Sequence, residues 1–281
     1  IIGFGNYGRY ILERAILTNI ISVDQHVAYH IFGDAKEFLA MHSHLHIMFS
    51  LGEQSDTTDS LIFHDEPWEQ HHTLMEQADR IIICTDDVPE GWSIFWHLNK
   101  YYKIHGQIHL HSNREAPGVS YFGTNEEIYT PNQIMRTELN KTAIMINEIF
   151  CRSVSYPTHT WEELDDFHRE SKIAAADHIL MKIRILLKDE TLTSYSSDIV
   201  AKAYLEYCKS KKDKTMQEMY RKLDHIRWVR FYSFYNWSYG VARHDGARQH
   251  PMLCPYKDLT PEQKKERDAA WEILGSIAMK V

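Results

Sequence analysis

The chain has few cysteines, and those that it has are scattered. None of its four cysteines, at positions 84, 151, 208 and 254, forms a Cys-x-x-Cys pair, the spacing typical of zinc ribbons. A disulfide framework is not expected either, because such frameworks occur in short secreted chains with many cysteines. We therefore predict a protein of a reducing compartment, the cytoplasm.

Long apolar runs are also missing. No stretch approaches the roughly 18 apolar residues that a membrane-spanning helix requires, and no signal peptide is recognisable. Ile1 and Ile2 have the character of the last residues of a strand, so we expect further sequence upstream. A membrane segment is expected only in that upstream part, which would make this chain the cytoplasmic part of an anchored protein.

Positive charge is in deficit. The 31 lysines and arginines are outnumbered by 39 acidic residues, for a net charge of -8. This argues against a nucleic-acid partner, because phosphate binding needs concentrated Lys and Arg. Basic residues do cluster at positions 209–214, which we interpret as a solvated linker.

The motifs of common catalytic classes do not occur. There is no Gly-x-Ser-x-Gly, Ser-x-x-Lys, P-loop lysine or His-Arg-Asp segment. The sequence therefore offers no recognisable catalytic residues for nucleophilic or phosphoryl-transfer chemistry. The 18 histidines include those at 42, 44 and 46, at 71–72 and at 109 and 111, but no His-Glu-x-x-His motif, and we predict no metal site. We predict a non-enzymatic protein, with an NAD(P)-dependent oxidoreductase as the alternative.

A glycine-rich turn stands at the start of the chain. Residues 3–8 read Gly-Phe-Gly-Asn-Tyr-Gly, a Gly-x-Gly-x-x-Gly pattern between a strand end and a predicted helix at residues 7–19. In dinucleotide-binding domains the first glycine allows the tight turn, the second lets a pyrophosphate approach, and the third lets helix and strand pack closely. The phosphates would lie at the positive end of the helix dipole.

Strands and helices alternate up to about residue 150. Further strands are predicted at residues 26–32, 46–49, 60–63, 81–84, 107–111, 119–122 and 127–129, and further helices at residues 36–42, 67–77, 89–102 and 131–150. Such alternation is typical of a parallel sheet built from βαβ units. We therefore predict an α/β fold, with a Rossmann-like parallel-sheet domain over residues 1–152.

Cofactor-binding residues are expected at the turn and after other strands, where open α/β sheets bind ligands. Asp34 follows the second strand, where an acidic residue would hold ribose hydroxyls, although a Gly-Asp pair is also an ordinary turn. Asp86 follows the most apolar strand, and helix capping is its alternative role. NAD or another adenine nucleotide is the expected cofactor. The candidate residues are Gly3, Gly5, Asn6, Tyr7, Gly8, Asp34, Thr85 and Asp86.

The first half resembles the TrkA-type regulatory nucleotide-binding domains of bacterial potassium transport and ligand-gated systems. The resemblance covers about residues 1–150 and rests on the glycine turn with its preceding isoleucines and on the segment Ile-Ile-Ile-Cys-Thr-Asp-Asp at positions 81–87. It implies that the domain binds a nucleotide to transmit a conformational change, rather than to transfer hydride.

The rest of the chain is predicted to be helical. Helices are expected at residues 161–187 and 195–207, within a bridge over residues 153–214, and a further domain over residues 215–281. That domain contains His225-x-x-Trp228, then Trp-Ser-Tyr-Gly at 237–240 and His-Pro-x-Leu-x-Pro-Tyr at 250–256, and a last helix from Pro261. These motifs resemble the ryanodine-receptor-type repeat, a small, mainly helical module that occurs in tandem in animal calcium-release channels and singly in bacterial proteins.

The whole arrangement resembles a bacterial family with a nucleotide-binding domain, a helical bridge and a terminal repeat. Some members carry N-terminal membrane segments, and the resemblance implies sensing of nucleotide-derived signals in antiviral defence. We therefore predict a signalling protein that binds an ADP-ribose-like or cyclic adenine nucleotide, as a homodimer or higher homo-oligomer.

The repeat itself carries seven aromatic residues within positions 228–239, with arginines and histidines nearby. Aromatic rings can stack on a base, and arginines can bind phosphate oxygens. Core packing is the ordinary role of such aromatics, and an aromatic surface that docks a partner protein is a further alternative. The candidate ligand-binding residues are Arg227, Trp228, Trp237, Tyr239, Arg243, Arg248, His250 and Tyr256.

Overall fold

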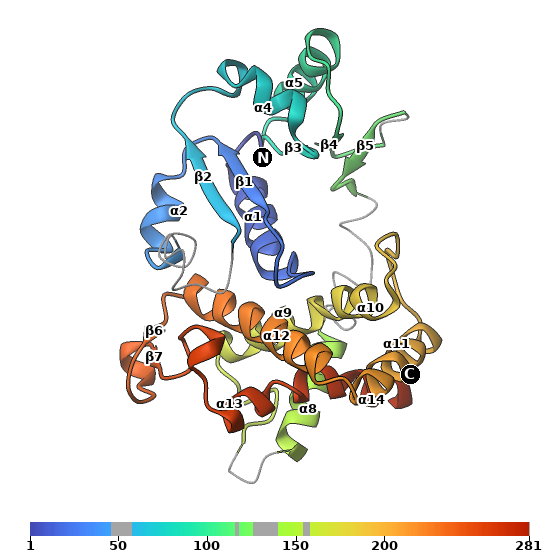
Figure 1. Cartoon of the computed structure of the whole chain (residues 1–281). Helices are drawn as coiled ribbons and strands as arrows, with labels where there is room; N and C mark the ends of the chain where they lie inside the picture. Colours follow the sequence, from blue (N-terminus) through green and yellow to red (C-terminus); the bar gives the residue numbers. More distant parts are fainter. Residues whose placement is uncertain (46–57, 116–117, 126–139, 154–157, 281) are drawn as a thin grey trace. The chain divides into compact units, whose positions relative to one another are not determined.

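The computed structural model describes residues 1–45, 58–115, 118–125, 140–153 and 158–280. The chain divides into two compact units, and Figure 1 shows their elements. The first unit comprises residues 1–15, 26–43 and 59–135, and the second comprises residues 16–25, 44–58 and 136–281.

The first unit is α/β. Its strands all pair in parallel, and Figure 1 shows β1 and β2 side by side. Its core contains Phe32, Ile83, Phe95 and Leu110. The elements are α1 (Asn6–Thr18, which ends in the second unit), β1 (Ala28–Phe32), α2 (Lys36–Met41), β2 (Ser60–His64), the 3-10 helix η2 (Trp68–Gln70), α4 (His72–Gln77), β3 (Arg80–Ile83), α5 (Val88–Tyr101), β4 (Gln107–His111) and β5 (Ser120–Phe122).

The start of the chain lies in the middle of the strand order. Ile2 makes parallel bridges to Phe32 at the end of β1 and to Ile83 at the end of β3. β1 pairs with β2 on one side, and β3 is followed by β4 and β5 on the other. The order is therefore β2, β1, Ile2, β3, β4, β5. Because every pairing is parallel, the carboxyl ends of these strands share one edge.

Several predicted elements of this unit are confirmed. The strands expected at residues 60–63, 81–84 and 107–111 correspond to β2, β3 and β4. The single helix expected at residues 67–77 is wrong, because His71 leaves the helical region at φ -107° and ψ 48° and separates η2 from α4. The strands predicted at 46–49 and 127–129 lie outside the described residues, as does the first part of the helix predicted at 131–150.

The second unit is mainly helical. Asp213 caps α12 by accepting hydrogen bonds from two backbone N–H groups of the first turn, and Thr260 forms a capping box with Gln263 at α13. No helix in the described ranges combines the length and apolar character needed to cross a membrane. The elements are α8 (Lys141–Ser153), α9 (Asp166–Asp177), α10 (Ile179–Leu187), α11 (Ser197–Ser210), α12 (Lys214–Phe234), β6 (Ser238–Tyr239), η3 (Asp245–Ala247), β7 (Gln249–His250), η4 (Tyr256–Asp258), α13 (Pro261–Glu266) and α14 (Ala269–Lys280).

Two long helices predicted here are wrong. The helix expected at residues 161–187 is interrupted at His178, which separates α9 from α10, and the last helix is divided into α13 and α14. The core of this unit joins Tyr207 and Val200 of α11 to Trp271 and Leu274 of α14. Residues of the predicted bridge and of the predicted repeat therefore share one hydrophobic core.

Candidate functional site

The glycine turn before α1 is packed against the end of β3. Gly3 has φ +89°, a conformation that favours glycine, and a Cβ atom there would lie 2.7 Å from the backbone nitrogen of Thr85. A Cβ atom on Gly8 would lie 2.2 Å from the carbonyl oxygen of Gly3. Two of the three glycines are thus required by close backbone packing.

The second glycine gives room to a carboxylate. The backbone N–H of Asn6 donates to Oδ2 of Asp86 over 3.3 Å, and a Cβ atom on Gly5 would lie 2.2 Å from that same oxygen. The carboxylate therefore lies at the first turn of α1, where the helix dipole favours negative charge. A phosphate oxygen would be attracted to the same place for the same reason.

Thr85 and Tyr7 lie close to this turn in different roles. Thr85 is buried, and its hydroxyl donates to the carbonyl oxygen of Asp87 over 2.8 Å, at the start of α5. The ring of Tyr7 is 40% exposed and lies 3.9 Å from the ring of His111, centroid to centroid. His111 is the last residue of β4, and its Nδ1 atom is buried without a hydrogen-bond partner.

Asp34 lies just beyond β1, as predicted. Its Oδ1 atom accepts a hydrogen bond from the backbone N–H of Lys36 over 3.0 Å, and the residue is exposed. Gly33 precedes it with φ +144°, and a Cβ atom there would lie 2.7 Å from Cβ of Phe4. The side chain therefore bonds to the first residue of α2 and remains accessible at the carboxyl edge of the sheet.

Cys84 packs against the glycine turn, and its thiol is not expected to be reactive. Its Sγ atom donates to the carbonyl oxygen of Gly3 over 3.2 Å. Burial raises the pKa of this thiol to about 12, so it stays protonated at neutral pH and is a poor nucleophile. Its role is to pack beneath the glycine turn.

In the helical unit, two of the predicted ligand-binding residues line a pocket of about 210 Å³. Trp237 is 6% exposed and stacks on Phe167 with ring centroids 5.2 Å apart. Arg248 is exposed and donates from Nη1 to the carbonyl oxygen of Tyr235 over 3.0 Å. The remaining lining residues are Asp165, Phe167, His168, Tyr235 and Asp245.

Charge in this pocket is organised in pairs. Asp165 lies 2.7 Å from Nδ1 of His168, and burial, which raises its pKa, is outweighed by hydrogen bonds from His168, so the pKa falls. Asp245 accepts two hydrogen bonds from Arg243, which lower its pKa. The pocket therefore has aromatic walls, and charged side chains of both signs lie at its rim.

Three other predicted residues pack together in a separate cluster. The ring of Trp228 lies 5.0 Å from that of His250, and the guanidinium of Arg267 lies 5.1 Å from the Trp228 centroid. Tyr256 is 5% exposed and packs with Met252. Burial lowers the pKa of His250 to about 4, so this ring is neutral at pH 7, and its Nδ1 accepts from the backbone N–H of Met252.

Arg243, a further predicted residue, is exposed and pairs with Asp245 at the rim of the pocket. The last two predicted residues lie in opposite environments. Arg227 is 6% exposed and donates from Nε to Oδ1 of Asp224 over 3.2 Å, which makes it part of a buried ionic group. Tyr239 is 57% exposed on β6. The eight predicted residues are therefore distributed over a pocket, a packed cluster, a buried ionic group and the surface.

Sequence reasoning missed the pocket residues contributed by the segment around α9. Asp165, Phe167 and His168 lie about 70 residues before Trp237 along the chain, and no local pattern connects the two segments. It also missed a group in the α/β unit, His64, Glu66 and His71, whose potential ligand atoms all lie within 4.8 Å of one another. Only His71 belonged to a pattern noted in the sequence.

Comparison with known proteins identifies one region of the chain. No curated protein and no solved structure matches the chain. Residues 209–279, however, match the family model of the RyR domain. The C-terminal region, from the end of α11 to the end of α14, is therefore similar to the RyR domain, which confirms the resemblance seen in its sequence motifs.

Proposed function

We propose that this chain is a nucleotide-responsive regulatory protein whose α/β unit binds an adenine nucleotide, such as NAD, at the glycine turn. The observation that carries the proposal is the packing of that turn. Gly3 and Gly8 meet backbone atoms at distances that no side chain tolerates, and Gly5 leaves the first turn of α1 open to an anion. These are the three tasks of glycines in a dinucleotide-binding turn.

The strand order supports this proposal. The order β2, β1, Ile2, β3, β4, β5 is that of a doubly wound dinucleotide-binding sheet, 3-2-1-4-5-6, when Ile2 is counted as the first strand. In such a sheet the ligand binds where the order reverses, beyond the carboxyl ends of the strands. The glycine turn follows Ile2 at that point.

Two carboxylates would have different roles in binding. Asp34 lies after β1, where an acidic side chain accepts hydrogen bonds from ribose hydroxyls. Asp86 lies at the first turn of α1, where the pyrophosphate would bind. Two anions at one helix end repel each other, so the Asp86 side chain must rotate away before a phosphate group occupies this place.

The pocket of the helical unit is proposed as a second nucleotide site. Its volume of about 210 Å³ is below the range of about 300–1,000 Å³ typical of ligand pockets. It would therefore hold a single ring system, such as an adenine base, against Trp237 and Phe167. Arg248 at the rim would bind phosphate of an ADP-ribose-like or cyclic adenine nucleotide. From the resemblance of the whole arrangement to a bacterial family, we further propose that such sensing serves antiviral defence.

The two sites can be tested together by isothermal titration calorimetry with NAD, ADP-ribose, ATP and cyclic dinucleotides. In the α/β unit, Gly5→Val is expected to abolish binding, because its side chain fills the space beside Asp86. Asp86→Asn is expected to bind roughly fivefold more tightly, since a screened like-charge contact costs about 1 kcal/mol. Asp87→Asn is the matched control, because Asp87 is the next residue along the chain but its own carboxylate makes no hydrogen bond to α1.

In the helical unit, Arg248→Gln should weaken binding of any nucleotide that occupies the pocket, whereas Lys202→Gln, an exposed residue of α11, should not. If no nucleotide binds the wild-type chain, the regulatory proposal is wrong. Consumption of NADH with any substrate would instead favour the oxidoreductase.

A further inference from the structure

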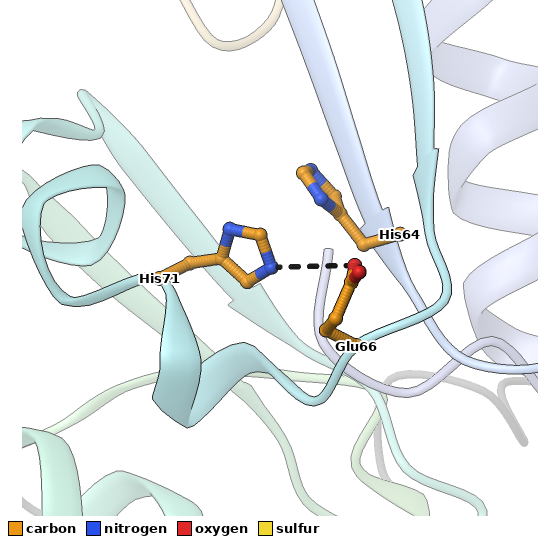
Figure 2. A group of neighbouring side chains, drawn as sticks. All are labelled: His64, Glu66 and His71. Carbon is orange, nitrogen blue, oxygen red and sulfur yellow. Dashed lines mark ion pairs between the residues drawn. The ribbon is translucent and has the colours of Figure 1, made fainter.

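Three potential metal ligands come together at the carboxyl edge of the sheet. His64 is the last residue of β2, Glu66 follows in the connection to η2, and His71 stands between η2 and α4. Figure 2 shows the two imidazole rings and the carboxylate turned toward a common space. We infer that His64, Glu66 and His71 bind a divalent transition-metal ion, with Zn²⁺ as the probe.

The distances suit a site that closes around an ion. The three ligand atoms lie within 4.8 Å of one another, and Nε2 of His71 is 4.0 Å from Oε2 of Glu66, the pair joined by the dashed line in Figure 2. Ligands at about 2.1 Å from a tetrahedral Zn²⁺ ion lie about 3.4 Å apart. Closure of the site therefore requires movements of about 1 Å, within the range of side-chain rotation.

His71 is already set apart from ordinary hydrogen bonding. Its Nε2 atom is buried and has no hydrogen-bond partner, because the Glu66 carboxylate is too distant to accept. A buried nitrogen without a partner is costly. Coordination of an ion between His71 and Glu66 would satisfy both groups at once.

The ring of His64 is held in place by its neighbours. It stacks on Phe32 with centroids 4.3 Å apart and an angle of 8° between the ring planes. Nε2 of His64 lies 2.9 Å from Nδ1 of His30, two residues before Phe32 on β1. Histidine ligands are commonly oriented by such a partner on their second ring nitrogen, so His30 is a positioning residue of this site.

The donor set and the exposure both suit a transition metal. Two imidazoles and one carboxylate are the ligands of many zinc sites that keep a fourth position for water, and the same set favours transition ions over Mg²⁺ or Ca²⁺, which prefer oxygen alone. The side chain of Glu66 is 60% exposed and that of His71 is 24% exposed. An ion can therefore enter from solvent.

The test is metal binding to the chelator-treated full chain, measured by equilibrium dialysis with Zn²⁺ and by the visible absorption of bound Co²⁺. The wild type is expected to take up one equivalent more than the double variant Glu66→Gln with His71→Ala. Each single variant should bind that equivalent at least about tenfold more weakly. His30→Ala should also weaken it, and Mg²⁺ should not compete.

The matched control is His72→Ala, which removes the adjacent, 57% exposed histidine, whose Nδ1 lies 3.8 Å from Glu76. It should bind as the wild type does. Glu66→Gln keeps the shape of an exposed side chain, so its effect does not depend on altered folding. Equal uptake by the wild type and the double variant, or an equal loss in His72→Ala, would overturn the inference. No nucleotide is needed, so failure here is separable from failure of the proposed function.

Discussion

Asp224 is a buried carboxylate surrounded by cations in the helical unit. It is 2% exposed, and its oxygens lie 3.2 Å from Nε of Arg227, 3.9 Å from Nζ of Lys182 and 3.8 Å from Nη1 of Arg267. Burial by itself raises the pKa of Asp224, but the three cations more than offset this effect and lower the pKa to about 2. The single negative charge of Asp224 thus lies among three cationic side chains. One of them, Lys182, also donates a hydrogen bond to the carbonyl oxygen of Ala270.

Asp224→Asn should therefore destabilise the protein strongly. Removal of one partner leaves buried charge uncompensated, for which about 3–5 kcal/mol is typical. The free energy of unfolding from urea titration is the measurement. Asp198→Asn, an acidic residue in the first turn of α11, should cost less than about 1 kcal/mol. Equal stabilities of the two variants would show that the buried ionic group contributes nothing.

His178 should make stability depend on pH. Its ring is fully buried, Nε2 donates to the carbonyl oxygen of Ile20 over 3.0 Å, and burial lowers its pKa to about 3. Between pH 6.5 and 3 the unfolded chain takes up a proton that the folded chain cannot. This stabilisation is therefore present above pH 6.5 and is lost on acidification, by about 1.4 kcal/mol per pH unit.

The measurement for His178 is urea unfolding at pH 7 and at pH 5. His178→Gln keeps a donor toward Ile20 but has no proton to gain, so its free energy of unfolding should fall less between these values than that of the wild type. The difference in pH dependence is the readout, because the substitution itself also changes stability at pH 7. Parallel pH profiles would contradict the assignment.

At the scale of elements, α1 depends on the absence of a side chain at Gly8. Helix propensity alone predicts that Gly8→Ala stabilises the protein by about 1 kcal/mol. The Cβ atom, however, would lie 2.2 Å from the carbonyl oxygen of Gly3, so we expect destabilisation instead. Urea unfolding gives the sign directly, and a stabilised Gly8→Ala variant would show that the turn relaxes without cost.

The elements that could be predicted from sequence are those with strong local patterns. β3 and β4 are short apolar or alternating runs between polar residues, and α5 begins with Pro89 in its first turn. The break at His178 has no proline or glycine to announce it. The ring there bonds to Ile20, which lies 158 positions away along the chain, and such a contact has no local signal.

The candidate sites differ in the same way. The glycine turn could be recognised because its pattern is local and each glycine has a steric reason: backbone atoms lie against Gly3 and Gly8, and the Asp86 carboxylate lies against Gly5. The aromatic residues of the repeat could not be sorted, because Phe231 and Phe234 are core whereas Trp237 lines a pocket. Phe167, the residue that completes this pocket wall, belongs to another helix, and only long-range packing brings it there.

At the scale of the molecule, the α/β unit concentrates its unusual polar groups at one edge of its sheet. The glycine turn follows Ile2, Asp34 follows β1, His64 ends β2, and Asp86 follows β3. Since all the pairings are parallel, this edge collects the carboxyl ends of every strand. The proposed nucleotide and metal sites thus share an edge without sharing a residue, so each can be removed by substitution while the other is measured.

At the proposed nucleotide site, the Asp86 carboxylate, which accepts a hydrogen bond from the first turn of α1, would compete with the phosphate of the ligand. A nucleotide bound at the proposed site would have to displace it, so the apparent affinity would be the intrinsic affinity reduced by the fraction of molecules in which the carboxylate has turned away. Such competition would shift the whole binding curve to higher nucleotide concentration without changing its shape. The residue that replaces phosphate in the resting state would then determine the concentration at which the protein responds.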